Sequence, residues 1–160
     1  MKIRVGFGYD MHRLVEGKDL WMGGVKIDYK KGLLGHSDAD VLIHAICDAL
    51  LGAANMRDIG FHFPDTAAEY KNVDSKLLLA EVRKLLAGKG YSIGNIDSTI
   101  CAEMPKMNPH IPAMQKVMSE ILQIDIDDIS IKATTSERMG FVGREEGITA
   151  YATVLIEKKD

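Results

Sequence analysis

The chain has 160 residues, of which 46% are hydrophobic and 27% are charged, and its formal net charge is −3. This length fits one domain with a substantial core, and the composition is ordinary for a globular protein. No basic run stands out, which argues against nucleic-acid binding driven by counterion release.

The N-terminal third predicts a strand followed by a hairpin. Apolar residues alternate over 2–9, which is typical of a half-buried strand. The apolar face of this strand holds Ile3, Val5, Phe7 and Tyr9. Two short apolar runs over 20–27 flank Gly23 and Gly24 and predict a β-hairpin, because both glycines accept positive φ. A loop rich in glycine and lysine is expected after it.

The clearest helix is expected from Ser37 to about Gly52. Ser37 with Asp40 three residues later resembles a capping box, and Gly52 suits a C-terminal cap. The residues between them leave the helix little polar surface. We therefore expect a buried helix whose polar members, His44 among them, need partners.

The rest of the chain predicts two more helices and three strands. The stretch 53–73 shows no clean period, and an irregular segment of this length in a compact domain is usually functional or mobile. Helices are expected over about 75–87 and 109–123, and strands over 91–103, 129–133 and 148–156. The chain is therefore expected to be one α+β domain over 1–160, with a small mixed sheet and three helices.

The cysteines and the N-terminus favour a cytoplasmic protein. Cys47 and Cys101 lie far apart without a CxxC pattern, so we expect buried thiols in a reducing compartment. The first residues lack the apolar stretch of a signal peptide and the character of a transit peptide. No stretch approaches the ~18 consecutive apolar residues of a membrane span, so no membrane contact is expected.

Asp10, His12 and His44 form a candidate metal site. Asp10 and His12 stand where the first strand is expected to end, and positions i and i+2 of an extended chain point the same way. A carboxylate and two imidazoles suit zinc, and three protein ligands leave a fourth position for a reacting oxygen. Asp48, four residues after His44, is a candidate to orient the imidazole. The same donors also fit the facial triad of non-haem iron oxygenases, although that triad usually lies among many strands.

Two polar segments are candidates for phosphate binding. His36 and Ser37 stand at the expected N-terminus of the first helix, where free N–H groups and the helix dipole favour an anion, although Ser37 also suits a plain cap. The run 134–137 offers three hydroxyls and a carboxylate, and Glu137 could hold Mg²⁺ or Mn²⁺ against a diphosphate; such runs are often plain turns. The basic candidates, with solvated surface as their alternative, are Lys106 and Arg144.

Five segments in order span nearly the whole chain: GYDMH, LLGHSDADVLIHAICDALLGA, DIGFHFPD, AEMPKMNPHIP and KATTSERMGFVGREEG. Together they resemble the 2-C-methyl-D-erythritol 2,4-cyclodiphosphate synthases of the non-mevalonate isoprenoid pathway. The resemblance implies a phosphorus–oxygen lyase that cyclises 4-diphosphocytidyl-2-C-methyl-D-erythritol 2-phosphate and releases CMP. It also implies a mixed four-stranded sheet backed by helices, assembled as a homotrimer with active sites between subunits.

The resemblance also assigns roles to residues. The implied zinc ligands are Asp10, His12 and His44. A second ion, Mg²⁺ or Mn²⁺, is implied at Glu137, and His36 and Thr135 match the residues that position and stabilise the reacting phosphates. The segment around the methylerythritol unit matches Asp58, Ile59, Gly60, Phe63, Pro64 and Asp65. The cytidine pocket and its surroundings match Ala102, Pro105, Lys106, Met107, Asn108, Ala133 and Thr134. The other implied substrate contacts are Asp10, His12, Ser37, Ser136, Phe141 and Arg144.

Three positions depart from the common pattern of this family. Tyr9 stands where phenylalanine is common, Ser136 replaces a threonine, and Asn108 replaces an apolar residue. Only Tyr9 affects the expectations, because a phenol in an apolar cavity needs a hydrogen-bond partner.

Two rival functions use the same metal donors. A metallohydrolase would use zinc to activate a water. A non-catalytic module would hold a structural zinc and would need a fourth protein ligand, such as His36 or Asp48.

Overall fold

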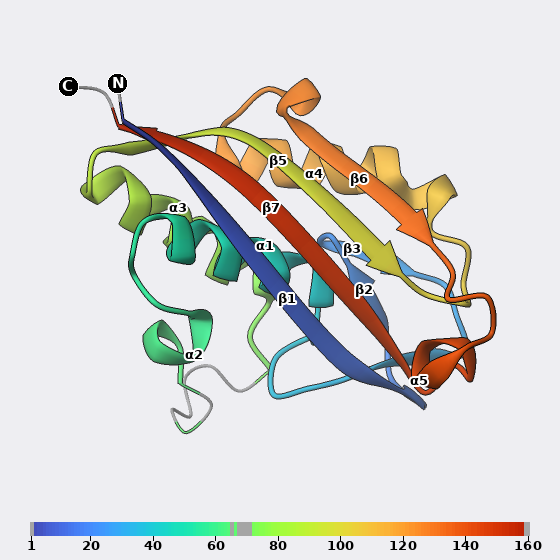
Figure 1. The fold of residues 1–160 in the computed structure, drawn as a ribbon. Helices are drawn as coiled ribbons and strands as arrows, with labels where there is room; N and C mark the ends of the chain where they lie inside the picture. The colour runs from blue at the N-terminus through green and yellow to red at the C-terminus, as the bar shows by residue number, and fades with distance from the viewer. Residues whose placement is uncertain (1, 65, 67–71, 159–160) are drawn as a thin grey trace.

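The chain folds into a mixed sheet of five strands in the order β4-β1-β7-β5-β6. Figure 1 shows β1, β7, β5 and β6 side by side in this order. This computed structural model describes residues 2–64, 66 and 72–158. The strands are β1 (Lys2–Glu16), β4 (Lys31–Leu34), β5 (Tyr91–Cys101), β6 (Ile129–Thr134) and β7 (Gly147–Lys158). In this sheet β5 and β6 run parallel to each other, and the other neighbouring pairs formed by described residues are antiparallel. A separate hairpin pairs β2 (Leu20–Met22) with β3 (Val25–Ile27), as the glycine pair predicted.

The helices cover one face of the sheet and leave the other uncovered, as Figure 1 shows. The helical elements are α1 (Val41–Ala53), α2 (Ile59–His62), α3 (Ser75–Gly88), α4 (Ile111–Leu122), α5 (Gly140–Gly143) and the 3₁₀ turns η2 (Asn108–His110) and η3 (Ile126–Asp128). The three longest, α1, α3 and α4, are the three that the sequence predicted. Within the described residues, no helix combines the length and the apolar character needed to cross a membrane. The α+β class is confirmed.

The expectation of a four-stranded sheet is wrong, because β4 adds a fifth strand. This segment was expected to be a loop rich in glycine and lysine, but it pairs antiparallel with β1 through Arg13↔Leu34 to Glu16↔Lys31. The strand is only four residues long, too short for a period-two pattern to be visible. Its pairing depends on β1, which extends to Glu16 instead of ending near residue 9. Asp10 and His12 therefore lie inside a strand, and their side chains still share one face.

The first long helix begins at Val41, not at Ser37. Asp40 is its N-cap, and its carboxylate accepts the backbone N–H of Ile43 at 3.0 Å. The same fully buried carboxylate accepts the N–H groups of Gly23 at 2.9 Å and Gly24 at 2.7 Å. Asp40 thus joins the hairpin to the helix. His36 and Ser37 therefore lie in the loop before α1 and not at its N-terminus, so the expected helix start is wrong, and their predicted role in phosphate binding stays a prediction.

The helix α1 lies directly on β1 because two glycines of the strand face it. A Cβ added to Gly8 would lie 1.9 Å from the carbonyl oxygen of Ala45, and one added to Gly6 would lie 1.9 Å from that of Ala49. Any side chain on this part of the strand would push the helix away. This close approach brings α1, which carries His44, next to the strand that carries the other candidate ligands.

The apolar face of β1 is not buried within this chain. Its residues point to the uncovered side of the sheet, and their exposed fractions are large: Ile3 52%, Val5 66%, Phe7 64%, Tyr9 41% and Met11 46%. The strand is half-buried as predicted, but the buried face is the one that carries Gly6 and Gly8 and packs on the helix, and the apolar face is the exposed one.

Candidate active site

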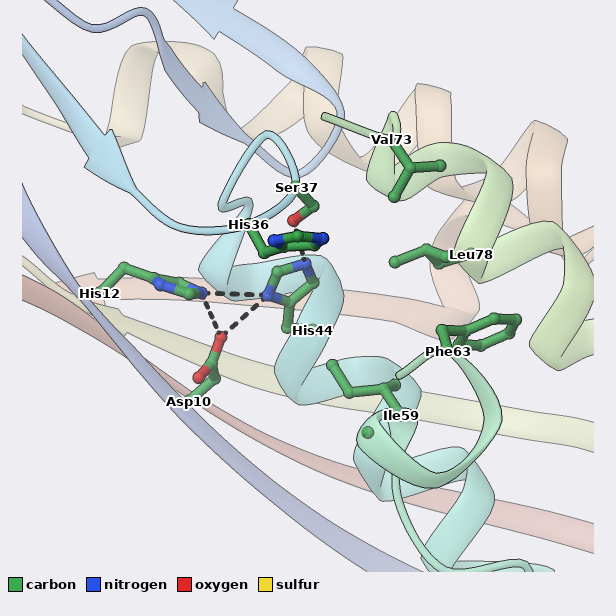
Figure 2. A pocket seen from close by; sticks show the side chains of 10 residues that line it. Asp10, His12, His36, Ser37, His44, Ile59, Phe63, Val73 and Leu78 are labelled. Carbon is green, nitrogen blue, oxygen red and sulfur yellow. Dashed lines mark hydrogen bonds and ion pairs between the residues drawn. The ribbon is translucent and has the colours of Figure 1, made fainter. Parts of the chain in front are cut away.

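Three side chains from β1 and α1 converge on one point, as Figure 2 shows. Asp10 Oδ2 lies 3.0 Å from His12 Nε2 and 3.0 Å from His44 Nδ1, and the two histidine nitrogens are 3.1 Å apart. Ligands of a tetrahedral zinc at about 2.0–2.1 Å lie roughly 3.3 Å from one another, so this triangle is close to the size that zinc requires. The predicted convergence is confirmed, and the three side chains could bind a metal ion.

The nitrogen of each imidazole that points away from this triangle is also hydrogen-bonded. His12 Nδ1 lies 3.1 Å from the carbonyl oxygen of Leu34 in β4, and since a carbonyl only accepts, Nδ1 carries the proton and Nε2 presents its lone pair. His44 Nε2 lies 2.9 Å from Ser75 Oγ and 3.2 Å from Ser37 Oγ. These contacts fix the orientation of both rings as a metal site requires.

The charges within the cluster reinforce one another. Burial opposes ionisation of Asp10, but hydrogen bonds from His12 and His44 outweigh it and hold the pKa of Asp10 well below its ordinary value. Burial likewise disfavours a charged His44, but the Asp10 carboxylate outweighs it and raises the pKa of His44. Without a metal the cluster therefore holds a carboxylate that attracts cations, which is the charge a divalent ion needs.

A cavity of about 210 Å³ opens beside the cluster. Its lining residues are Asp10, His12, His36, Ser37, His44, Ile59, Gly60, Phe63, Val73 and Leu78. The Nε2 atom of His36 is buried there and has no hydrogen-bond partner among the described residues. A buried polar nitrogen without a partner is costly unless a ligand supplies one. The cavity is therefore suited to a molecule that carries hydrogen-bonding oxygens.

The short helix α2 forms one wall of this cavity. Asp48 does not orient His44 as predicted; its Oδ1 instead accepts the N–H of Ile59 at 2.8 Å and so anchors α2 to α1. Asp58 caps α2 by accepting the N–H of Phe61 at 2.9 Å and is not among the lining residues, and neither is Pro64. Asp65 lies outside the described residues.

A second cavity, of about 150 Å³, lies where the parallel strands β5 and β6 end. Its lining residues are Ala102, Pro105, Lys106, Met107, Asn108, Ala133, Thr134 and Thr135. Seven of these were matched to the cytidine pocket by the resemblance, and the eighth is Thr135. Ligands commonly bind outside the carboxyl ends of parallel strands. The structure therefore brings this predicted group together, and it shares no lining residue with the first cavity.

The turn after β6 holds Glu137 in a left-handed conformation, with φ of 52°. The hydroxyl of Thr135 lies 3.3 Å from Glu137 Oε1 and also accepts the N–H of Glu137 at 3.3 Å. Ser136 donates its N–H to Glu103 at 3.3 Å and its hydroxyl to the carbonyl of Met139 at 2.7 Å. Glu137 is exposed and stands apart from the Asp10–His12–His44 group, so an ion on it would need further ligands from a substrate.

Phe141 and Arg144 lie in neither cavity. Phe141 lines a further hollow of about 220 Å³ together with His12 and Gly147, the first residue of β7. The guanidinium of Arg144 is exposed and binds Glu146 through two contacts, at 2.9 and 3.1 Å. Within one chain, these two predicted substrate contacts are thus not brought to the site.

Two residues beside His44 were missed by the sequence reasoning. Ser75 opens α3 and is fully buried, and Asp38 lies in the loop before α1. A serine at the start of a helix indicates a cap and nothing more, and the contact between Ser75 and Asp38 spans 37 residues of chain. No local pattern in the sequence could have paired them.

Comparison with known proteins identifies the family. The YgbB family model matches residues 3–157. A 2-C-methyl-D-erythritol 2,4-cyclodiphosphate synthase of Bacteroides fragilis is 70% identical over 158 residues, covering 99% of both chains, and that of Phocaeicola vulgatus is 69% identical over the full length of both. Among solved structures, the IspF–CDP complex of Plasmodium falciparum superposes with a TM-score of 0.87 at 37% identity, covering 99% of this chain and 97% of that one. The bifunctional IspDF of Campylobacter jejuni gives 0.95 at 39% identity, covering 99% of this chain and 43% of that longer one. This chain belongs to the YgbB family.

Proposed function

We propose that the chain converts 4-diphosphocytidyl-2-C-methyl-D-erythritol 2-phosphate to 2-C-methyl-D-erythritol 2,4-cyclodiphosphate and CMP, as a phosphorus–oxygen lyase of isoprenoid biosynthesis. The observation that carries the proposal is the convergence of Asp10, His12 and His44 beside a cavity. It occurs in a chain 70% identical to a relative that bears the name of this synthase.

The reaction requires the 2-phosphate oxygen to attack the β-phosphorus while both groups are anionic. Asp10, His12 and His44 would hold a zinc ion and Glu137 a magnesium or manganese ion, and bound ions of this kind would supply charge neutralisation for the phosphates. The donor set of one carboxylate and two imidazoles supports zinc, because three protein ligands are typical of catalytic zinc sites.

The protein's own groups hold the substrate so that the attacking and departing oxygens lie in line. His36, whose Nε2 lacks a partner, and Ser37 would donate hydrogen bonds to phosphate oxygens in the first cavity. Thr135 would help to position the reacting phosphates, and the other residues that line the second cavity would hold the cytidine end. Holding both ends of a flexible molecule is worth up to ~7–11 kcal/mol in intramolecular reactions. No protein nucleophile is needed, and Asp58 and Pro64 would add further substrate contacts.

The uncovered face of the sheet supports a homotrimer. Large apolar side chains of β1 are exposed there, including Val5 at 66% and Phe7 at 64%, and such a patch marks an interface. Tyr9 donates its hydroxyl to Met11 Sδ at 3.4 Å and packs against Tyr151 with ring centroids 5.0 Å apart, so its phenol has a partner on this face. Three copies follow the assembly that the family resemblance implies. Because the two cavities share no residue within one chain, we place the active site between neighbouring copies.

The decisive experiment is product identification. Purified protein loaded with zinc is incubated with the cytidylated substrate and magnesium, and the products are followed by ³¹P NMR. We expect equal amounts of CMP and a cyclic diphosphate. Release of CMP with an open-chain 2,4-bisphosphate, in which water has taken the place of the 2-phosphate as the attacking group, would instead identify a hydrolase. No reaction with a fully loaded protein would reject the proposal.

The role of Glu137 has a test of its own. Glu137→Gln removes the charge but keeps the size of the side chain, which is exposed. We expect unchanged zinc content and a higher magnesium concentration for half-maximal turnover, because the zinc ligands lie elsewhere. Turnover with the magnesium dependence of the unmodified protein would remove Glu137 from the second ion site.

A further inference from the structure

Two consecutive hydrogen bonds link His44 in α1 to Ser75 at the start of α3, and Ser75 to Asp38 in the loop before α1. The imidazole of His44 is 6% exposed and turns Nδ1 towards Asp10 and His12, while Nε2 lies 2.9 Å from Ser75 Oγ. Ser75, at the start of α3, donates its hydroxyl in turn to Asp38 Oδ1 and its backbone N–H to Asp38 Oδ2 at 2.9 Å. The result is a carboxylate, a hydroxyl and an imidazole in series, with the candidate metal position at the far end.

The direction of the protons follows from the donors and acceptors. An ionised carboxylate only accepts, so the hydroxyl of Ser75 gives its proton to Asp38. The oxygen of Ser75 is then free to accept, and His44 must donate from Nε2. A neutral imidazole protonated on Nε2 presents a lone pair at Nδ1, the atom that faces Asp10. The chain of contacts therefore selects the tautomer that a metal at Nδ1 requires.

We propose that Ser75 and Asp38 are positioning residues that orient His44 and strengthen Nδ1 as a metal ligand. This inference rests on the proposed metal site and deepens it. Metal-bound histidines commonly donate their second N–H to a carboxylate or carbonyl, and removing such a partner typically weakens metal binding 10–100-fold. In this chain a serine stands between the histidine and the carboxylate, which lets α3 contribute to a site built from β1 and α1.

Ser75 is not needed as the cap of its helix. The N-cap of α3 is Asp74, which accepts the N–H of Lys76 at 2.9 Å. Ser75 is fully buried, and the partners of its hydroxyl among the described residues are Asp38 and His44. Ser37 Oγ, the other neighbour of His44 Nε2, is farther away at 3.2 Å, and it accepts the N–H of Ala39.

The test is the zinc affinity of the full chain, measured by competition with a chromophoric chelator after the bound metal has been removed. We expect Ser75→Ala to bind zinc about 10–100-fold more weakly than the unmodified protein. Asp74→Ala is the matched control, because it removes the cap of the same helix without touching His44, and its affinity should stay within about twofold. Equal zinc affinity in Ser75→Ala and the unmodified protein would overturn the proposal, as would an equal loss in Asp74→Ala.

Asp38 is tested in combination, since it also accepts the N–H of Asp40 at 3.1 Å. If it acts through the hydroxyl, Asp38→Asn should weaken zinc binding much more in the unmodified protein than in Ser75→Ala; equal losses would contradict the relay. If Ser75→Ala does not fold, Ser75→Cys keeps the shape with a poorer hydrogen bond and should also lose affinity. His44→Ala distinguishes the two proposals, because normal zinc binding in that variant would reject the metal site itself.

Discussion

The two faces of β1 differ in what they contact. We call the face towards α1 the inner face and the face on the uncovered side of the sheet the outer face. The face towards α1 carries glycine at positions 6 and 8 and then Asp10 and His12, so the strand first admits the helix closely and then meets it with metal-binding groups. The opposite face carries large apolar side chains, such as Phe7, that are left exposed by the part of the chain that the structure describes. One strand therefore serves both the site and the proposed assembly, because alternate residues point to opposite faces.

The largest effect is expected where His44 of α1 meets the polar end of the inner face of β1. His44→Ala removes one of three converging ligands, so zinc should be lost and turnover should fall roughly a thousand-fold or more, since metal polarisation of a phosphoryl oxygen contributes several kcal/mol. Zinc content is measured by atomic absorption alongside product formation.

His36→Ala is the matched control for this prediction. His36 lines the same cavity but does not belong to the metal-binding group, so its loss should lower turnover and leave zinc content intact. Full zinc content and normal turnover in His44→Ala would show that the inner face of β1 is not the site.

The next effect tests the close packing on the glycine part of the inner face. Gly8→Ala places a Cβ 1.9 Å from the carbonyl oxygen of Ala45, so the helix must move, and we expect the free energy of unfolding to fall by about 3 kcal/mol. Denaturant unfolding at fixed protein concentration measures the change. Gly52→Ala is the control, because that glycine is exposed in α1 with no atom within 4 Å of the added Cβ, and alanine should stabilise the helix by about 0.5–1 kcal/mol. Equal midpoints for both variants would contradict this packing.

The sequence predicted the inner face well at the metal site and poorly elsewhere. Asp10 and His12 could be paired because strand geometry is local, and His44 was identified because a buried polar residue needs a partner. The contact between Asp38 and Ser75 joins a loop to a distant helix and leaves no periodic signal. The alternation in β1 correctly separated its two faces, but alternation alone does not say whether the apolar face packs on this chain or on another copy.

A substitution on the outer face is expected to change the assembly of the copies and to affect the fold of the single chain less. Phe7→Asp places a charge in the middle of the exposed apolar row, and we expect it to dissociate the proposed homotrimer into monomers. These monomers should keep zinc, because the side chain of Phe7 points away from the metal-binding group. Sedimentation velocity measures the assembly. Leu77→Asp is the control, because Leu77 is exposed to a similar extent, 60% against 64%, but lies on α3. The proposed interface is wrong if Phe7→Asp sediments like the unmodified protein, or if the chain is already a monomer.

The smallest effect on stability is expected from the ion pair between Asp97 and Lys132, on the same outer face of the sheet. Phe7 lies opposite Thr153, which lies opposite Asp97, and Asp97 binds Lys132 Nζ at 2.5 and 2.6 Å. The hydrogen bond from Lys132 holds the pKa of Asp97 below its ordinary value of 3.8. Both side chains are about half exposed, so Lys132→Met should lower the free energy of unfolding by less than about 1 kcal/mol at pH 7.

The sign of the pH dependence follows from the lowered pKa. The ion pair stabilises the fold above the unfolded pKa of Asp97, near 3.8, and this contribution is lost as the pH falls from there through the folded pKa. The difference between Lys132→Met and the unmodified protein should therefore be constant from pH 5 to 7 and shrink below about pH 4, and 1 M salt should reduce it at every pH. Denaturant unfolding at several pH values measures it. A difference well above 1 kcal/mol that persists in salt would mean that a partner copy covers this charged end, so the interface would extend across the whole outer face.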